Sequence, residues 1–298
     1  MAWWEGHDLV AREAASEQVV EAEPEKPKLR YEASDERWTV SRVELVQQVW
    51  GEGFAGPGGE EGILDLVKPL GLTAAMNVLE VGAGLGGASR IMADRFGAWV
   101  TGLESDGKLA GAGMALSTKA GFAKKAPIQT FDPEHFEAPP KTYDCLVSKE
   151  FLFTVQDKER LFRLFNTILK DHGQILFTDY VLPAPDQRSA ALESWAKRDP
   201  DKPQLWAMQN YIDVLTEHKL DIRIQEDITG DSRKVITQAW AEYMASVDQS
   251  KLDNAMVSAM VDEAEVWARR VKLLEAGDLK VCRFHALKKP SDKLLSDW

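Results

Sequence analysis

In the middle of the chain, segments with the apolar pattern of a strand alternate with segments with the apolar pattern of a helix. Short apolar runs, typical of buried strands, occupy residues 77–81, 98–103, 126–130, 143–148 and 173–180. Apolar residues at helical spacing occupy residues 86–96, 106–120 and 157–170. Strands that alternate with helices in this way are typical of a parallel sheet covered by helices on both faces. The pattern therefore predicts an α/β fold.

The flanking sequence has a different organisation. Helices are predicted at residues 38–50, 63–70, 208–218, 231–248 and 251–275, and further strands at 220–226 and 279–287. Residues 51–59 hold five glycines and one proline. Residues 183–206 are punctuated by prolines, and we expect them to form an insertion over the edge of the sheet.

The most informative stretch is residues 78–90, where an apolar run breaks into a glycine-rich turn before a helical pattern. The turn contains Gly82, Gly84, Gly86 and Gly87. Glycine lacks a Cβ atom, so the turn can adopt positive φ and a ligand can lie against bare backbone. The N-terminus of the following helix adds unpaired N–H groups that can bind the same ligand. This segment predicts a nucleotide or nucleoside site.

Two acidic residues narrow the choice of ligand. Glu104 ends the second predicted strand, where an acidic side chain accepts hydrogen bonds from ribose hydroxyls. Because NAD and S-adenosylmethionine both contain a ribose, Glu104 indicates a nucleoside without choosing between them. Glu80, just before the first glycine, would repel a pyrophosphate but not a cationic amino-acid end, which favours S-adenosylmethionine. The alternatives are an NAD-dependent reductase and a purely structural glycine turn.

From about Val46 to Leu182 the chain resembles the class I S-adenosylmethionine-dependent methyltransferases. The features that follow the order of that class are the glycine turn, Glu104, the Asp132 segment, and residues 143–148 and 169–180. Within the class the chain is most similar to the phosphoethanolamine and small-amine N-methyltransferases. The segments that carry this finer resemblance are residues 49–59, 148–150, 157–158, 179–180 and 226–229.

The resemblance implies a Rossmann-like sheet of seven strands, the last antiparallel, with N-terminal helices and a helical lid insertion before the last strand. With the composition, it divides the chain into five segments. These are an acidic, partly disordered arm (1–37), N-terminal helices with a glycine-rich cofactor lid (38–71), an S-adenosylmethionine-binding core (72–182), substrate lid insertions with a sixth strand (183–278), and a last strand with a tail (279–298).

The resemblance also implies a set of cofactor-binding residues. They are Glu80, Gly82, Ala83, Gly84, Gly86, Glu104, Ser105, Asp132, Ser148, Gly58 and Gly59. Glu80 would lie near the ammonium group of the cofactor. Asp132 would lie near the adenine amino group, unless it only forms a loop turn with Pro133. The loop that holds Gly58 and Gly59 would close over the methionine carboxylate, unless it is only a connector.

Methyl transfer from a sulfonium is an in-line displacement in which the protein mainly supplies placement and a dry pocket. In the resembled phosphoethanolamine enzymes a histidine stands six residues after the serine that matches Ser148, but here that position is Thr154, which cannot act as a base near neutral pH. The catalytic candidates are therefore Glu150, able to orient an amine or accept its proton, and Tyr180. We expect methylation of nitrogen or sulfur in a small-molecule acceptor. The alternative is a catalytically inactive S-adenosylmethionine-binding regulatory or partner protein.

Composition and charge argue against a nucleic-acid-binding protein, a membrane-spanning protein and a secreted protein. The formal net charge of −12 would repel a polyanion, so no nucleic acid is expected as a partner. No apolar run is long enough for a transmembrane helix, and the N-terminus lacks the profile of a signal peptide. Cys145 and Cys282 lie in predicted strands, which suggests buried reduced thiols. We expect a cytoplasmic protein without a metal site, for which a homodimer is one possible assembly.

Overall fold

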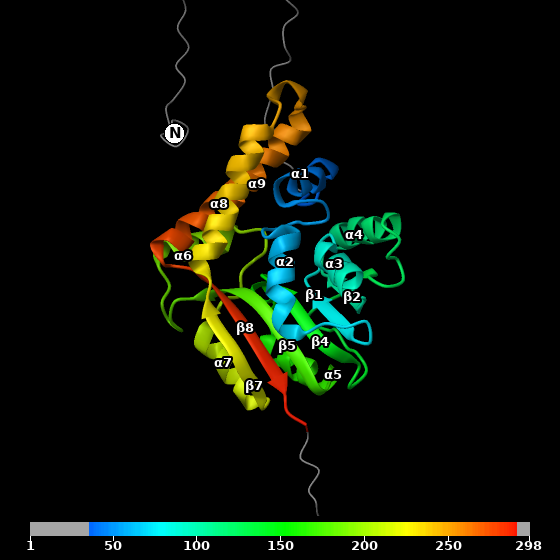
Figure 1. Cartoon of the computed structure of the whole chain (residues 1–298). Coiled ribbons are helices and arrows are strands. Elements are labelled where there is room, and N and C mark those ends of the chain that lie inside the picture. The colour runs from blue at the N-terminus through cyan, green and yellow to red at the C-terminus, as the bar shows by residue number, and fades with distance from the viewer. Residues whose placement is uncertain (1–35, 291–298) are drawn as a thin grey trace, which may run out of the picture.

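The computed structural model describes residues 36–290. The predicted acidic arm, residues 1–37, lies outside the described residues except at its end, and so does the tail from residue 291. In the described part of the chain, no helix is long and apolar enough to cross a membrane. Figure 1 shows one central sheet with helices on both sides and a further group of helices above it.

A mixed sheet of eight strands forms the centre of the molecule. Its strands are β1 (Asn77–Val81), β2 (Trp99–Glu104), β3 (Ile128–Thr130), β4 (Tyr143–Lys149), β5 (Leu169–Leu182), β6 (Trp206–Ala207), β7 (Leu220–Asp227) and β8 (Lys280–Lys288). The main path runs β3-β2-β1-β4-β5-β8-β7, and β8 is antiparallel to both β5 and β7 while the other pairs are parallel. The carboxyl ends of β1, β2, β4 and β5 therefore meet at one edge of the sheet.

The α/β fold with an antiparallel last strand is confirmed, but the expected number of seven strands is wrong. The eighth strand is β6, where Trp206 and Ala207 pair in parallel with Val181 and Leu182 at the end of β5. A strand of two residues is too short to show a period, which is why the pattern predicts only an insertion there. β5 also begins earlier than predicted, at Leu169, directly after a helix that ends at Ile168.

Helices cover both faces of the sheet. They are α1 (Val40–Trp50), α2 (Gly59–Val67), α3 (Gly87–Arg95), α4 (Gly107–Lys119), α5 (Lys158–Ile168), α6 (Ala190–Arg198), α7 (Met208–Glu217), α8 (Thr229–Ser246) and α9 (Asn254–Ala276), with short 3₁₀ turns at Lys68–Leu70, Leu152–Thr154 and Gln249–Lys251. Helices α2 and α3 share a core cluster with Val78 of β1, whereas α5 and α7 share another with the next residue, Leu79. This alternation is expected of a central strand that is buried on both faces.

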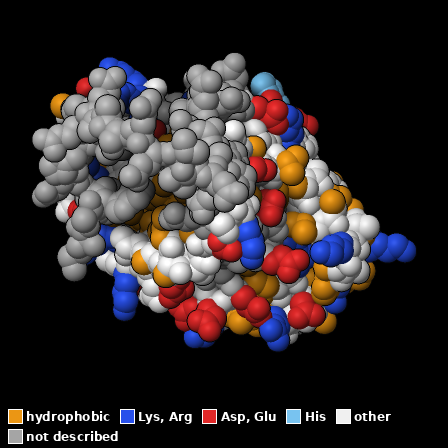
Figure 2. All heavy atoms as spheres, turned by 90° about the horizontal axis from the view of Figure 1, so that it is seen from above, with side chains coloured by type: hydrophobic (Ala, Val, Ile, Leu, Met, Phe, Trp, Pro, Cys, Tyr) orange, Lys and Arg blue, Asp and Glu red, His pale blue; other side chains and the backbone are white. Residues whose placement is uncertain are grey.

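Helices α8 and α9 form the predicted insertion between the last two strands of the fold, β7 and β8. Because β7 runs parallel to the central strands, its end and the start of β8 lie at their carboxyl edge, and the helix pair rises from that edge. Seen from above, the described atoms show acidic and basic side chains interspersed with hydrophobic ones (Figure 2).

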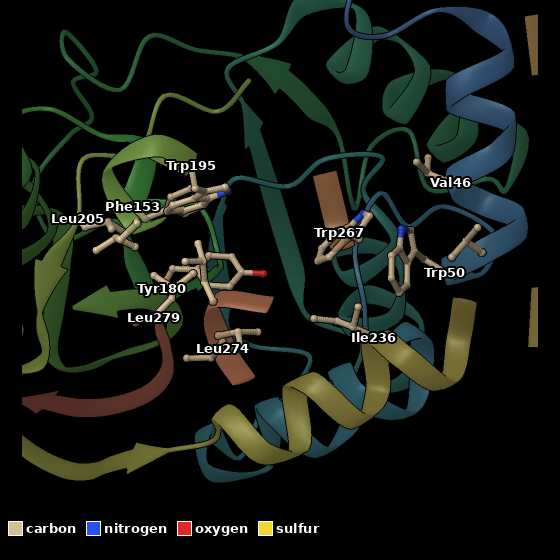
Figure 3. Packing of buried hydrophobic residues seen from close by; sticks show 14 of the residues in the cluster. Val46, Trp50, Phe153, Tyr180, Trp195, Leu205, Ile236, Trp267, Leu274 and Leu279 are labelled. Atoms are coloured by element: carbon tan, nitrogen blue, oxygen red, sulfur yellow. The ribbon is translucent and has the colours of Figure 1, made fainter. Parts of the chain in front are cut away.

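Tryptophan side chains hold this helix pair to the N-terminal helix α1. Trp50 of α1 meets Trp267 of α9 with ring centroids 4.8 Å apart, and Trp240 of α8 at 6.3 Å, both edge-on. Figure 3 shows Trp50, Trp267 and Ile236 of α8 at one side of the cluster, with Tyr180 and Phe153 at the other. The packing thus fixes α9 above the residues that follow β4 and β5.

Candidate functional site

The glycine turn after β1 depends on glycine for both conformation and space. The backbone N–H groups of Gly82 and Ala83 both donate to the carbonyl oxygen of Leu103, at 2.8 Å each. Gly82 has a φ of +81°, and a Cβ atom there would lie 2.3 Å from the side chain of Phe151. A side chain at this position would both strain the backbone and collide with a buried ring. The turn therefore brings backbone, without side chain, to the edge of the sheet.

Glu104, at the end of β2, is tied to this turn. Its carboxylate accepts hydrogen bonds from the backbone N–H groups of Gly84 at 2.8 Å and Asp106 at 2.9 Å. Burial raises the pKa of Glu104, although these backbone donors act in the opposite direction. Asp106 is the N-cap of α4, where its side chain accepts from the backbone N–H groups of Lys108 and Leu109. Glu104 is thus held in place by a strand end and two backbone donors.

The glycine-rich segment after α1 lies against the same turn. The N–H group of Gly87 donates to the carbonyl oxygen of Gly53 at 2.9 Å, and the N–H group of Gly53 donates to the side chain of Gln47 at 3.0 Å. A Cβ atom at Gly87 would lie 2.6 Å from that Gly53 oxygen, so the two segments approach closely only because a glycine is present. The segment is therefore docked on the turn.

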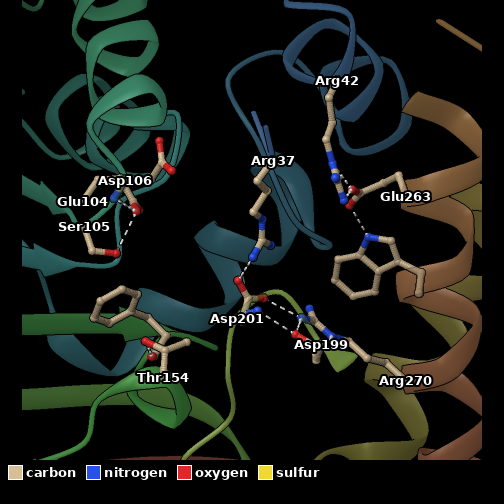
Figure 4. Close-up of polar contacts among 12 residues, drawn as sticks. Arg37, Arg42, Glu104, Ser105, Asp106, Thr154, Asp199, Asp201, Glu263 and Arg270 are labelled. Carbon is tan, nitrogen blue, oxygen red and sulfur yellow. Dashed lines mark hydrogen bonds and ion pairs between the residues drawn. The ribbon is translucent and has the colours of Figure 1, made fainter. Parts of the chain in front are cut away.

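A cavity of about 400 Å³ opens above the carboxyl edge of the sheet. We call one part of its wall the glycine end; it comprises Phe54, Ala55, Gly56, Pro57, Gly82, Ala83, Gly84, Glu104, Ser105 and Asp106. We call another part the ion-pair end; it comprises Arg37, Trp38, Thr154, Tyr180, Asp201, Glu263, Trp267 and Arg270. Figure 4 shows Glu104, Ser105 and Asp106 on one side and the ion pairs of Asp201 and Glu263 on the other.

Glu150 lines this cavity directly after β4. Its backbone φ is +43°, a value that is unusual for a residue with a side chain. The backbone N–H group donates to the carbonyl oxygen of Thr178, and the carboxylate accepts from the Thr178 hydroxyl, both at 2.8 Å. The other carboxylate oxygen pairs with Lys149. An unusual backbone conformation held by several contacts is typical of a functional site.

Tyr180 also lines the cavity, near the end of β5. Its ring meets Phe153 edge-on with centroids 5.1 Å apart, and the guanidinium of Arg270 lies 5.6 Å from the ring centroid. Burial strongly raises the pKa of the Tyr180 phenol, although Arg270 opposes this effect. The hydroxyl therefore stays protonated near neutral pH and can serve as a hydrogen-bond donor rather than as a base.

A network of ion pairs forms the far wall of the cavity. Arg270 of α9 donates to Asp199 from Nε at 3.1 Å and from Nη2 at 2.9 Å, and Nη2 also donates to Asp201 at 2.5 Å. The other oxygen of Asp201 pairs with Arg37 (Figure 4). Burial alone would raise the pKa of Asp201, but Arg270 and Arg37 lower it to about 2. Asp201 is therefore a carboxylate shared between two guanidinium groups.

A second ion pair joins α1 to α9 beside this network. Arg42 donates from Nε to Glu263 at 2.7 Å, and the indole N–H of Trp267 donates to the other oxygen of Glu263, also at 2.7 Å. The two side chains of the pair are buried. The ion-pair end thus combines residues from the segment before α1, from the turn after β4, from β5, from the loop after α6 and from α9. Arg42 of α1 supports it from outside the cavity wall.

A family of methyltransferase domains matches residues 59–222 of the chain, which is more than half of its length. The chain belongs to the methyltransferase family. S-adenosylmethionine is the cofactor of this family, and the predicted resemblance to the class I S-adenosylmethionine-dependent methyltransferases is confirmed.

Several named methyltransferases are similar to the chain. Phosphoethanolamine N-methyltransferase 3 of Arabidopsis thaliana is 32% identical over 204 residues, which are 67% of this chain and 40% of that protein. A phosphoethanolamine N-methyltransferase 2 of Haemonchus contortus, solved with phosphomonomethylethanolamine and S-adenosylhomocysteine, has a TM-score of 0.72 at 20% identity over 86% of this chain and 59% of that one. A putative sarcosine dimethylglycine methyltransferase of Galdieria sulphuraria has a TM-score of 0.70 at 16% identity, covering 83% and 98% of the two chains. The solved structures confirm the fold, and the chain spans less than half of the plant relative.

The methyltransferase fold brings several of the predicted site residues to the cavity wall. Those that line it are Gly82, Ala83, Gly84, Glu104, Ser105, Glu150 and Tyr180. Their positions follow from the shared carboxyl edge of the parallel strands. The cofactor and catalytic roles assigned to them remain predictions.

Other predicted site residues lie outside the lining. Glu80 is buried and accepts a hydrogen bond from the Ser89 hydroxyl of α3, and burial raises its pKa to about 7. The Ser148 hydroxyl donates to the carbonyl oxygen of Val81 at 2.8 Å. Asp132 is exposed and its carboxylate lies 2.7 Å from Nδ1 of His135. These side chains meet protein groups rather than the cavity.

The predicted glycines also divide between the cavity and the supporting structure. Gly86 is the N-cap of α3 and packs against the side chain of Ile128. Gly58 and Gly59 begin α2 and are absent from the cavity lining, whereas Gly56 and Pro57 line it. The part of the predicted lid that reaches the cavity therefore lies a few residues earlier than expected.

The charged residues of the ion-pair end are not predicted from the sequence, although Tyr180 is. Arg37, Asp201 and Arg270 are separated by 164 and 69 residues along the chain. No local pattern marks them, because each is an ordinary charged residue in its own segment. Among the described residues, no cluster of His, Cys, Asp or Glu could hold a metal ion.

Proposed function

We propose that the chain binds S-adenosylmethionine at the glycine end of the cavity and methylates a nitrogen atom of a small amine. The observation that carries this proposal is the position of Glu104. It ends β2 at the carboxyl edge, is held by the N–H group of Gly84, and lines the same cavity as Glu150 and Tyr180. A carboxylate in this place suits the two hydroxyls of a ribose.

The residues around the cavity fit such a ligand. Gly82, Ala83 and Gly84 offer backbone to the amino-acid part, and Glu104 offers two acceptor oxygens to the ribose. When bound, the cofactor would supply an electrophilic methyl group to a nitrogen lone pair of the acceptor, and the C–S electrons would stay on sulfur. The protein then needs mainly to orient the amine and to exclude water.

Glu150 and Tyr180 are the side chains best placed to orient the acceptor. The carboxylate of Glu150 is fixed by Thr178 and Lys149, so it presents a defined negative charge to an amine and can accept the proton that the methylated nitrogen releases. Tyr180 offers a protonated hydroxyl as donor. Thr154 takes no such part, because its hydroxyl donates to the carbonyl oxygen of Phe151 at 2.8 Å.

Nitrogen is favoured over sulfur by two observations. Several curated relatives are named phosphoethanolamine N-methyltransferases, and the cavity is lined by carboxylates that attract an ammonium group. A catalytically inactive binding protein is the second candidate, because Thr154 stands where the resembled enzymes carry a histidine.

The test is a thermal-stability assay with each cofactor, followed by transfer of labelled methyl groups. S-adenosylmethionine at about a hundred times its dissociation constant should stabilise the protein by about 2.7 kcal/mol, and NAD should not. Label should then appear in at least one amine of a panel that also contains phosphorylated amines and thioethers. Stabilisation by NAD alone would overturn the proposal, and stabilisation by S-adenosylmethionine without transfer to any acceptor would support the inactive binding protein.

A further inference from the structure

The charge balance of the ion-pair end bears on which amine can enter. The solved Haemonchus contortus relative holds phosphomonomethylethanolamine, a phosphate monoester. Such a group carries nearly two negative charges at neutral pH and offers only acceptor oxygens. A protein site for it normally supplies cationic side chains that are free to donate to those oxygens.

The cationic side chains around this cavity are already paired with carboxylates of the same chain. Arg270 donates to both Asp199 and Asp201, and Arg37 pairs with the other oxygen of Asp201. Lys149, the remaining cation of the described lining, pairs with Glu150. A phosphate bound to these cations would lie next to the carboxylates that already pair with them.

The charges of the side chains that line the cavity also disfavour a phosphate group. Among the described residues of the cavity wall, five are acidic and three are Lys or Arg. The acidic ones are Glu104, Asp106, Glu150, Asp201 and Glu263. Arg270 is further enclosed by aromatic rings, with its guanidinium 5.7 Å from Phe153 and 5.2 Å from Trp267. The wall therefore attracts cations and disfavours a dianion.

We infer that the methyl acceptor is an amine that carries no phosphate group, and that Asp201 is the residue that excludes phosphorylated amines. Asp201 stands between the two guanidinium groups that would otherwise receive a phosphate, and it pairs with both. This inference rests on the proposed function, because it concerns the acceptor of the same cavity. It departs from the ligand of the Haemonchus contortus relative, in spite of the shared fold.

The experiment compares ethanolamine with phosphoethanolamine, which differ only in the phosphate group. Each is titrated calorimetrically into the full chain saturated with S-adenosylhomocysteine, with wild type and Asp201→Asn in parallel. The wild-type protein should bind phosphoethanolamine no more tightly than ethanolamine. Asp201→Asn removes a negative charge and deprives Arg37 of its carboxylate partner, while Arg270 keeps Asp199, so it should tighten binding of phosphoethanolamine by at least about tenfold. Ethanolamine should not gain in the variant.

Asp221→Asn is the matched control, since it makes the same chemical change in a partly exposed pair with Arg223 away from the cavity. It should leave the preference between the two amines unchanged. Tighter wild-type binding of phosphoethanolamine than of ethanolamine would overturn the inference, as would an Asp201→Asn variant that gains no affinity for phosphoethanolamine. If the Asp201→Asn variant does not fold, the affinities of the wild-type protein for the two amines test the inference by themselves. Failure to bind S-adenosylhomocysteine at all would instead count against the proposed function.

Discussion

The glycine end and the ion-pair end of the cavity are built in different ways. At the glycine end, one short segment of chain forms a strand, a turn and a helix, and the backbone N–H group of Gly84 in that turn donates to the carboxylate of Glu104. At the ion-pair end, side chains from three separate segments meet through charge, as Arg37, Asp201 and Arg270 do. The first end depends on backbone geometry and the second on matched charges.

This difference separates what the family shares from what an individual member can change. A backbone turn that requires glycine tolerates few substitutions, because Gly82 has positive φ and lies against Phe151. A wall of ion pairs can be altered by exchanging both partners of a pair, without any change in backbone conformation. We therefore expect cofactor binding to follow the family and acceptor choice to be specific to this chain.

The largest expected effect is on stability, from Arg270→Met at the ion-pair end. The variant leaves Asp199 and Asp201 without the cation that they share. The loss is costly because the side chains of Arg270 and Asp199 are only 6% and 1% exposed. Removing one partner of such a buried pair should lower the free energy of unfolding by about 3–5 kcal/mol. Urea unfolding followed by circular dichroism measures this change.

Arg95→Met provides the comparison, because Arg95 pairs with Glu60 through side chains that are about half exposed. An exposed pair contributes little, so the control should unfold nearly like wild type. Equal losses in the two variants would show that the ion-pair end is no more than surface charge.

The next effect is on the rate, from Glu150→Gln between the two ends. Glutamine keeps an oxygen that can accept from the Thr178 hydroxyl but loses the negative charge that attracts an amine and accepts its proton. We expect kcat to fall by about a hundredfold, as is typical when a general base is lost. Binding of S-adenosylhomocysteine should be unchanged.

The control for this variant is Glu217→Gln, which neutralises an exposed residue at the end of α7. It should retain the wild-type rate. An unaltered kcat in Glu150→Gln would show that Glu150 takes no part in the reaction. A parallel loss of cofactor affinity would show that Glu150 acts in cofactor binding.

The glycine end could be predicted from sequence because its determinants are local. The turn and Glu104 follow successive strands, and Glu150 and Tyr180 lie at the ends of two more, so a parallel sheet gathers them at one edge. The ion pairs of the ion-pair end could not be predicted, since pairs such as Arg37 with Asp201 depend on how distant segments pack. The periodicity of apolar residues along the chain does not predict such long-range contacts.

The sequence also did not predict which way the side chain of Glu80 points. Its charge favours S-adenosylmethionine in the sequence argument, but its direction is set by strand alternation. Leu79 and Val81 pack in the cluster that contains α5, so Glu80 points to the opposite face and meets Ser89 of α3. The residue supports the turn from behind instead of lining the cavity.

The division of the cavity is tested most directly by calorimetric titration of S-adenosylhomocysteine into two charge-neutralising variants, Glu104→Gln and Asp201→Asn. The first should weaken binding by about tenfold to a hundredfold, because hydrogen bonds to a charged acceptor are stronger than those to an amide. The second should bind S-adenosylhomocysteine as wild type does. Equal affinities in wild type and Glu104→Gln, or a greater loss in Asp201→Asn, would contradict the placement of the cofactor at the glycine end.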